Sequence, residues 1–221
     1  PREGKTYVGT TDTVYEGDIA HPVMTIEDRD YILKAIQYMF PTVQVTEHDV
    51  ESSWAGLRPL IGEEGKSPSE ISRKDEIFES KSGLISIAGG KLTGYRKMAE
   101  EVVDIIVDRM VKENQSVFYP NNTENLPISG GDVGGSVGFE SFKEKQIQQA
   151  VQLGLSEEDA EVMIQRYGSN ITHIFDYYEQ ANKQDAIIDP LTEAILQYSI
   201  QHEAACTPSD IFIRRTGALF F

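Results

Sequence analysis

The sequence has almost no cysteine and no grouped set of histidines. Cys206 is the only cysteine among 221 residues, so the chain can form neither an internal disulfide nor a cysteine-based zinc site. The four histidines lie far apart, without the spacing of metal ligands: His21, His48, His173 and His202. These residues favour a protein of the reducing cytoplasm that holds no metal.

Long hydrophobic runs and a secretory leader are also missing. No apolar stretch approaches the ~18–20 residues of a membrane span. Residues 1–12 carry neither an initiator methionine nor the basic and apolar regions of a signal peptide, and they begin like a strand entered partway. We therefore expect a piece of a longer cytoplasmic chain.

Positive charge is scarce. The chain has 20 lysines and arginines against 36 acidic residues, a net charge of −16. Such a surface repels phosphate backbones and anionic lipid, so general nucleic-acid binding is excluded. Hydrophobic residues make up 39% of the sequence, which suffices for a globular protein with a real core.

Residues 1–120 mix strand and helix patterns, which predicts an α+β fold for this part. Strands are expected over residues 7–11, 43–53 and 84–88. A helix is expected to begin at a capping box formed by Thr25 and Asp28, and to stop at Pro41. The polar stretch 62–80 is expected to form a surface excursion.

The rest of the chain has a different composition and residue pattern. Residues 121–138 are rich in glycine and predict a linker, and residues 139–221 predict a small all-α domain of about four or five helices. Ser156 is expected to cap one helix, Gly168 to end it and Thr207 to open the last. Four apolar side chains either fill the core of this domain or form a partner surface: Ile171, Ile174, Phe175 and Tyr178.

Gly89 and Gly90 stand where the strand predicted over 84–88 meets a helical pattern. Glycine lets a ligand approach the backbone, and the first N–H groups of a helix attract negative charge. Lys91 adds a cation, and Thr93 can cap the helix or bind a ligand. The ligand is a phosphate or a ring oxygen that becomes anionic; the alternative is a plain turn with a solvated lysine. The spacing is neither a dinucleotide fingerprint nor a P-loop.

Arg58 precedes a proline, in the segment that follows the predicted strand 43–53, and lies two residues after Gly56. Pro59 favours an extended backbone at Arg58, which aims a guanidinium suited to carboxylate or phosphate. A structural salt bridge explains Arg58 equally well. Arg73 is a weaker candidate, and a surface charge explains it more simply.

Taken together, four stretches resemble the flavin-dependent glycerol-3-phosphate dehydrogenases, which belong to the wider FAD-dependent oxidoreductases: residues 8–12, 54–60, 67–73 and 89–99. Residues 89–96 read Gly-Gly-Lys-Leu-Thr-Gly-Tyr-Arg, where Gly94 replaces a threonine of the family pattern. Residues 210–216 resemble the end of the family's C-terminal helical domain. The family's N-terminal Gly-x-Gly-x-x-Gly turn is absent, so the chain resembles the C-terminal portion of such an enzyme.

The resemblance implies oxidation of sn-glycerol 3-phosphate to dihydroxyacetone phosphate, with hydride transfer to FAD and electrons passing to quinone. Arg58 would contact the substrate as the catalytic residue, and Arg73 and Lys91 would help hold it. Further residues would lie along the cofactor: Gly56, Gly89, Gly90, Lys91, Leu92 and Thr93. The implied fold is part of a mixed substrate- and FAD-binding sheet with helices, followed by the helical domain.

Several alternatives stay open. An oxidase that passes electrons to oxygen shares the same motifs. A non-catalytic helical module for interaction or assembly belongs to a different class, and the isolated piece is expected to be inactive without the rest of the FAD-binding domain. Docking of the whole enzyme at the inner face of the cell membrane and a homodimer are also open.

Overall fold

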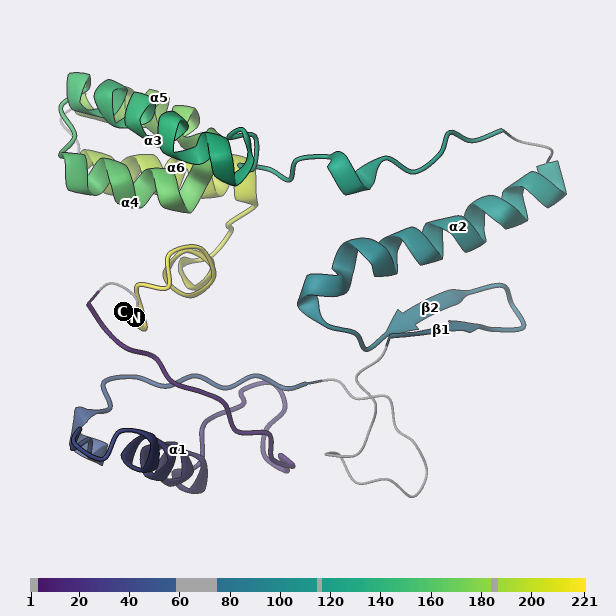
Figure 1. The fold of residues 1–221 in the computed structure, drawn as a ribbon, viewed down its shortest axis with the longest axis horizontal. Helices are drawn as coiled ribbons and strands as arrows, with labels where there is room; N and C mark the ends of the chain where they lie inside the picture. Colours follow the sequence, from purple (N-terminus) through teal and green to yellow (C-terminus); the bar gives the residue numbers. More distant parts are fainter. Residues whose placement is uncertain (1–3, 59–74, 115–116, 184–186) are drawn as a thin grey trace. The chain divides into compact units, whose positions relative to one another are not determined.

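The computed structural model describes residues 4–58, 75–114, 117–183 and 187–221. By its internal contacts the chain forms two compact units, Pro1–Glu124 together with Phe220–Phe221 (unit 1) and Asn125–Leu219 (unit 2). The described residues are mostly helical, with one small two-stranded sheet (Figure 1).

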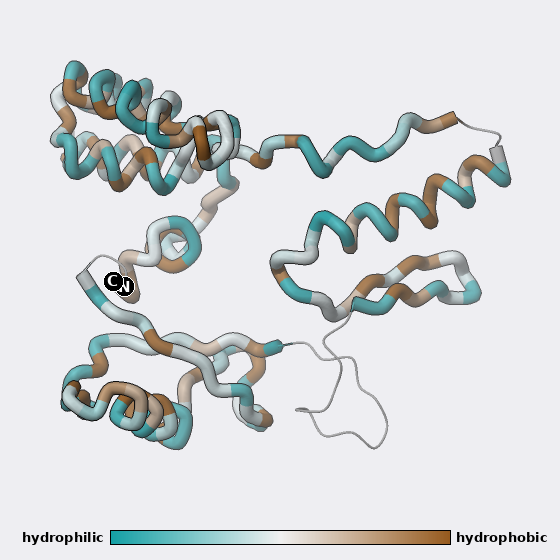
Figure 2. Tube along the Cα trace, viewed as in Figure 1, coloured by the Kyte–Doolittle hydropathy of each residue, from teal (hydrophilic) through white to brown (hydrophobic). Residues whose placement is uncertain are grey.

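Unit 1 combines two long helices with a hairpin. Its elements are α1 (Ile26–Met39), η1 (Glu47–Asp49), β1 (Glu76–Glu79), β2 (Ile85–Ala88), η2 (Leu92–Gly94) and α2 (Tyr95–Asn114), with η3 (Thr123–Asn125) at its boundary. Hydrophobic positions recur between hydrophilic ones along α2, as expected for an amphipathic helix (Figure 2). Yet Asp28 is the only buried side chain among the described residues of unit 1.

The start of α1 confirms the predicted capping box. The Thr25 hydroxyl accepts from the Asp28 N–H at 3.1 Å, and the Asp28 carboxylate accepts from the Thr25 N–H and hydroxyl. Hydrogen bonds from the hydroxyls of Thr11 and Thr25 hold the pKa of the Asp28 carboxyl below its usual range. The helix ends at Met39, two residues before Pro41.

The strands correct three expectations. The strand predicted over 84–88 is present as β2, and its antiparallel partner β1 corrects the surface excursion predicted over 62–80 at residues 76–79. Residues 62–74 of that prediction lie outside the described residues. The predicted strands 7–11 and 43–53 are wrong for the described residues, because a strand needs a hydrogen-bonded neighbour and neither segment has such a ladder. Within the second of these, residues 47–49 form a 3₁₀ turn instead.

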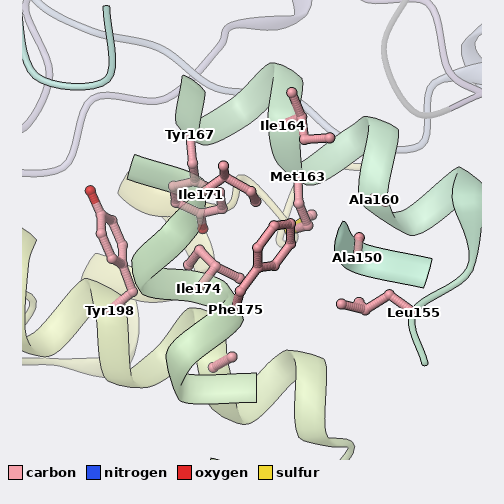
Figure 3. Packing of buried hydrophobic residues seen from close by; sticks show 11 residues of the cluster. Ala150, Leu155, Ala160, Met163, Ile164, Tyr167, Ile171, Ile174, Phe175 and Tyr198 are labelled. Atoms are coloured by element: carbon pink, nitrogen blue, oxygen red, sulfur yellow. The ribbon is translucent and has the colours of Figure 1, made fainter. Parts of the chain in front are cut away.

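Unit 2 is helical and holds its own core. Its elements are α3 (Gly135–Gln152), α4 (Glu157–Tyr167), η4 (Gly168–Asn170), α5 (Ile171–Asn182), α6 (Pro190–Glu203) and the π-helix η5 (Asp210–Arg215). Helix α5 packs on α6 and α3 on α4. Ile164, Ile171 and Ile174 are fully buried, with Phe175 beside them (Figure 3).

These packed side chains decide one of the open alternatives. Ile171, Ile174 and Phe175 are at most 2% exposed, and Tyr178 packs against the same cluster. The core interpretation is therefore confirmed for Ile171, Ile174 and Phe175, which offer no surface to a partner, while Tyr178 is partly buried against the same core.

The limits of α4 follow its local sequence. The Ser156 hydroxyl accepts from the Asp159 N–H at 3.0 Å, as predicted for an N-cap. Gly168, with φ of 54°, follows the last residue of the helix, as predicted.

Loss of the Ser156 cap should cost about 1 kcal/mol of the free energy of unfolding, because Ser156→Ala leaves a helix N–H without its acceptor. Urea unfolding followed by circular dichroism measures this loss. Ser141→Ala, at an exposed position inside α3, is the matched control and should change stability little, since alanine is the better helix former there. Equal losses in the two variants would contradict the capping role.

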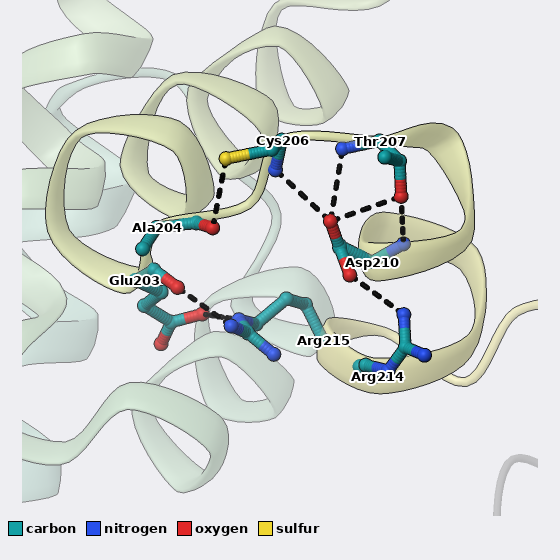
Figure 4. Close-up of polar contacts among 7 residues, drawn as sticks. All are labelled: Glu203, Ala204, Cys206, Thr207, Asp210, Arg214 and Arg215. Atoms are coloured by element: carbon teal, nitrogen blue, oxygen red, sulfur yellow. Dashed lines mark hydrogen bonds and ion pairs between the residues drawn. The ribbon is translucent and has the colours of Figure 1, made fainter.

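Asp210 ties the start of η5 to the preceding turn (Figure 4). Its carboxylate accepts from the N–H groups of Cys206 and Thr207, from the Thr207 hydroxyl at 2.9 Å and from Arg214 at 2.7 Å. The Thr207 hydroxyl accepts from the Asp210 N–H at 3.3 Å, so Thr207 opens this last helical segment as predicted. These donors lower the pKa of the Asp210 carboxyl from 3.8 to about 2.

This depressed pKa makes stability depend on pH in acid. Since the folded pKa lies near 2 and the usual value is 3.8, the contribution of Asp210 is present above that usual value and is lost as the pH falls through about 2. Asp210→Asn should therefore flatten the fall in melting temperature between these two pH values. An unchanged slope in the variant would show that other carboxylates cause the fall.

Candidate functional site

The turn after β2 requires its glycines for reasons inside the chain. Gly89 and Gly90 have φ of 81° and 78°, in the left-handed region that side chains with a Cβ rarely adopt. A Cβ on Gly90 would also lie 2.5 Å from the Met98 sulfur on α2. The two glycines thus let the strand reverse and pack on the helix that follows.

Lys91, Leu92 and Thr93 form the exposed rim of this turn. Lys91 has an extended backbone and precedes the 3₁₀ turn η2, so α2 begins at Tyr95 and not directly after the glycines. The Leu92 side chain is 90% exposed. Within the part of the chain that the structure describes, neither the Lys91 ammonium nor the Thr93 hydroxyl has a hydrogen-bond or ion-pair partner. Both groups are available to a ligand.

Arg58 is held from one side by an acid. Its Nη1 donates to Asp12 Oδ2 at 2.6 Å, and its side chain is 44% exposed. This is the salt bridge that the sequence left open as an alternative. A guanidinium carries five N–H donors, so the pair with Asp12 leaves donors on the exposed side for a carboxylate or phosphate.

Gly56 lies two residues before Arg58, and nothing in the described chain explains why this position is a glycine. Its φ is not positive, and a Cβ built on it would meet nothing within 4 Å. Gly94 in η2 has the same two properties. Neither the backbone nor the neighbouring side chains therefore require glycine there, and both positions allow a ligand or further chain to approach closely.

The structure places only some of the predicted site residues near one another. Residues 89–93 lie together as one turn, and Gly56 lies beside Arg58 in sequence. Arg73 lies outside the described residues. Asp12 was not predicted from the sequence as the partner of Arg58, and no local spacing could have revealed it because the two residues are 46 positions apart.

Among the residues that the structure describes, no three side chains of histidine, cysteine, aspartate or glutamate are grouped to hold a metal ion. None of the helices in those same ranges has the length and apolar character to cross a membrane.

Two family models match the chain. Residues 1–96 match the FAD dependent oxidoreductases, and residues 121–221 match the C-terminal domain of alpha-glycerophosphate oxidase. The candidate turn at residues 89–93 therefore lies near the end of the first match, and unit 2 lies wholly in the second.

Individual relatives agree with these matches. Over its full length the chain is 58% identical to the aerobic glycerol-3-phosphate dehydrogenase of Bacillus subtilis (strain 168) and 51% identical to that of Staphylococcus aureus (strain USA300), covering 40% of each. Among solved structures, it is similar to the glycerol-3-phosphate dehydrogenase from Bacillus halodurans complexed with FAD, with 48% identity and a TM-score of 0.86. It covers 42% of that chain, so it spans about two fifths of the length of these relatives.

Proposed function

We propose that this chain, whose residues 1–96 match the FAD dependent oxidoreductases, is part of a flavoenzyme that oxidises sn-glycerol 3-phosphate to dihydroxyacetone phosphate. One observation carries the proposal: the chain is similar over 100% of its length to aerobic glycerol-3-phosphate dehydrogenases, at up to 58% identity. The exposed cations at Arg58 and Lys91 suit an anionic substrate of this kind.

The described residues fit a flavin and a phosphate. Gly56 leaves open the space that a Cβ would fill, and Lys91 has no partner among the described residues. FAD, when bound, supplies the acceptor for the hydride of the substrate. The proposed cofactor-binding residues are Gly56, Gly89, Gly90, Lys91, Leu92 and Thr93.

The proposed substrate-binding residues are Arg58, Lys91 and Arg73. The guanidinium of Arg58 orients the substrate or polarises its C2 oxygen with the donors that Asp12 does not use. The positive end of α2, a helix of 20 residues, favours an electron-rich group near residues 89–93. A dipole of this kind contributes ~0.3–2 kcal/mol, whereas enzymes typically supply at least ~8 kcal/mol, so positioning must provide most of the rate enhancement.

We also propose the finer organisation of the chain. Residues 1–120 form part of the FAD- and substrate-binding domain, with the hairpin β1–β2 and the extended segments 5–12 and 51–58 belonging to its mixed sheet. Residues 121–138 connect it to the helical domain 139–221. A cytoplasmic location, docking of the whole enzyme at the inner face of the membrane and a homodimer remain predictions from the sequence.

Quinone is the electron acceptor we propose, and oxygen is the competing acceptor. The relatives with the highest identity quoted above are named dehydrogenases, while the matching C-terminal domain takes its name from an oxidase. Mixing the anaerobically reduced flavoprotein with oxygen or with a soluble quinone analogue separates the two. Reoxidation that is faster with oxygen than with the quinone would favour the oxidase.

The proposed reaction is tested on the full-length flavoprotein under anaerobic conditions. Addition of sn-glycerol 3-phosphate should bleach the oxidised flavin absorbance within the mixing time of a stopped-flow experiment. Glycerol and inorganic phosphate, added separately, are the controls and should leave the spectrum oxidised. A flavin that glycerol 3-phosphate does not reduce would refute the proposal.

A further inference from the structure

Two extended segments of unit 1, residues 5–12 and 51–58, lie side by side in one register. Lys5 forms an ion pair with Glu51, and Asp12 forms one with Arg58; both pairs are separated by 46 positions in sequence. An equal separation at both ends means that the segments run in the same direction. The position of Arg58 beside Asp12 therefore depends on how one segment is placed along the other.

Aromatic side chains join the two segments between these ion pairs. The rings of Tyr7 and Trp54 have their centroids 6.0 Å apart at an interplanar angle of 50°. Trp54 lies four positions before Arg58 and is 50% exposed. A tilted arrangement at this distance is attractive for two aromatic rings.

Residues Phe220 and Phe221 complete this contact from the far end of the sequence. They group with unit 1, and the Ser52 hydroxyl donates to the Phe220 carbonyl at 2.9 Å. The ring centroids of Phe220 and Trp54 are 5.0 Å apart, and the ring centroid of Phe221 lies 5.9 Å from those of both Trp54 and Tyr7. We call Tyr7, Trp54, Phe220 and Phe221 the aromatic cluster.

We propose that the aromatic cluster positions Arg58 for the substrate. Phe220 and Phe221 hold Trp54 against Tyr7, and this fixes the register of the segment that ends at Arg58. The inference rests on the proposed function, in which Arg58 binds glycerol 3-phosphate. Phe220 and Phe221 are then positioning residues, since they act through Trp54 and not on the substrate.

The kinetic test uses the full-length flavoenzyme with Phe220→Ala/Phe221→Ala. Because substrate orientation is loosened while the flavin and Arg58 remain, KM should rise about fivefold and kcat should change less than about twofold. Tyr119→Ala is the control, since this side chain of unit 1 is 99% exposed and should leave KM unchanged. Phe220→Tyr/Phe221→Tyr, which keeps both rings, should restore the original KM. An unchanged KM in the double alanine variant overturns the inference.

A double-mutant cycle shows whether the effect passes through Arg58. In an Arg58→Lys background, which has lost the guanidinium fork, the two alanine substitutions should add no further rise in KM. If the two alanine substitutions instead raised KM by the same factor in both backgrounds, the cluster would act independently of Arg58. That result overturns the inference. Ser52→Ala, which keeps all four rings but removes the hydrogen bond to Phe220, should raise KM in the same direction and by less.

Fluorescence separates a failure of this inference from a failure of the proposed function. Trp54 is the only tryptophan of the chain, and its signal is obtained as the difference from a Trp54→Phe variant. Acrylamide should quench Trp54 more strongly when Phe220 and Phe221 are alanine, whatever the substrate is. Unchanged quenching overturns the inference even in an active enzyme. A wild-type enzyme that does not turn over glycerol 3-phosphate refutes the proposed function, and with it the role of the cluster in binding that substrate.

Discussion

Arg58→Ala should lower kcat/KM for glycerol 3-phosphate about 100-fold, because hydrogen bonds to charged groups contribute ~1.5–3 kcal/mol each and a tenfold change corresponds to ~1.4 kcal/mol. The Arg58 side chain is half exposed, and Asp12 uses only part of its donor set. Steady-state kinetics of the full-length enzyme measure the loss. Free guanidinium should recover part of the activity of the alanine variant, since it supplies the missing planar donors.

The control for Arg58 is a second ion pair between the same two segments. Lys5→Ala removes the pair with Glu51 and leaves the pair between Asp12 and Arg58 intact. If Arg58 contacts the substrate, this variant should keep kcat/KM within about twofold of the wild type, since a surface ion pair contributes only ~0–1 kcal/mol. Equal losses in both variants would instead show that Arg58 acts only as a structural salt bridge.

Gly168→Ala should lower the free energy of unfolding of unit 2 by about 3 kcal/mol, since left-handed backbone costs ~1–2 kcal/mol for a residue with a Cβ and overpacking adds ~1–3 kcal/mol. Gly168 has φ of 54°, and a Cβ there would lie 2.0 Å from the Gly130 carbonyl oxygen. That oxygen cannot simply move away, because it accepts a hydrogen bond from the Ser169 N–H at 2.9 Å.

Gly154→Ala isolates the contact from the backbone strain. Gly154 also has a positive φ, 96°, but a Cβ there would meet nothing within 4 Å. Its substitution should therefore cost only the conformational part, about 1–2 kcal/mol. Urea unfolding of both variants gives the difference. If the two variants lost equal stability, the close approach of the 130 loop to the end of α4 would contribute nothing.

Local signals allowed the helix limits to be predicted from the sequence. The caps at Thr25 and Ser156 and the glycine at 168 each depend on residues within a few positions of one another, so the sequence contains the whole interaction. The strand β1 was missed because Ile77 and Phe78 stand in a longer polar stretch, and their pairing with β2 is not visible in the local composition. Residues 7–11 and 43–53 have strand-like composition, but composition alone does not provide a hydrogen-bonded partner.

The candidate site likewise has one part that local sequence predicts and another that depends on contacts between distant residues. The Gly89–Gly90 turn was recognisable because strand, glycines and helix are consecutive, although part of the reason for Gly90 is its contact with Met98. The pairing of Arg58 with Asp12 depends on two segments 46 positions apart, and only three-dimensional structure reveals such a contact. The same holds for the rings of Phe220 and Phe221 on Trp54.

The return of the chain to unit 1 at Phe220 has a consequence for proteolysis. All of unit 2 lies in sequence between Glu124 and Phe220. The backbone that connects the two phenylalanines to Trp54 therefore passes through the whole helical unit. A single trypsin cut after Arg215 would leave the helices of both units uncut and would release the peptide that carries these rings. The circular dichroism spectrum of the cut enzyme would then resemble that of the intact enzyme, although Arg58 would no longer be aligned.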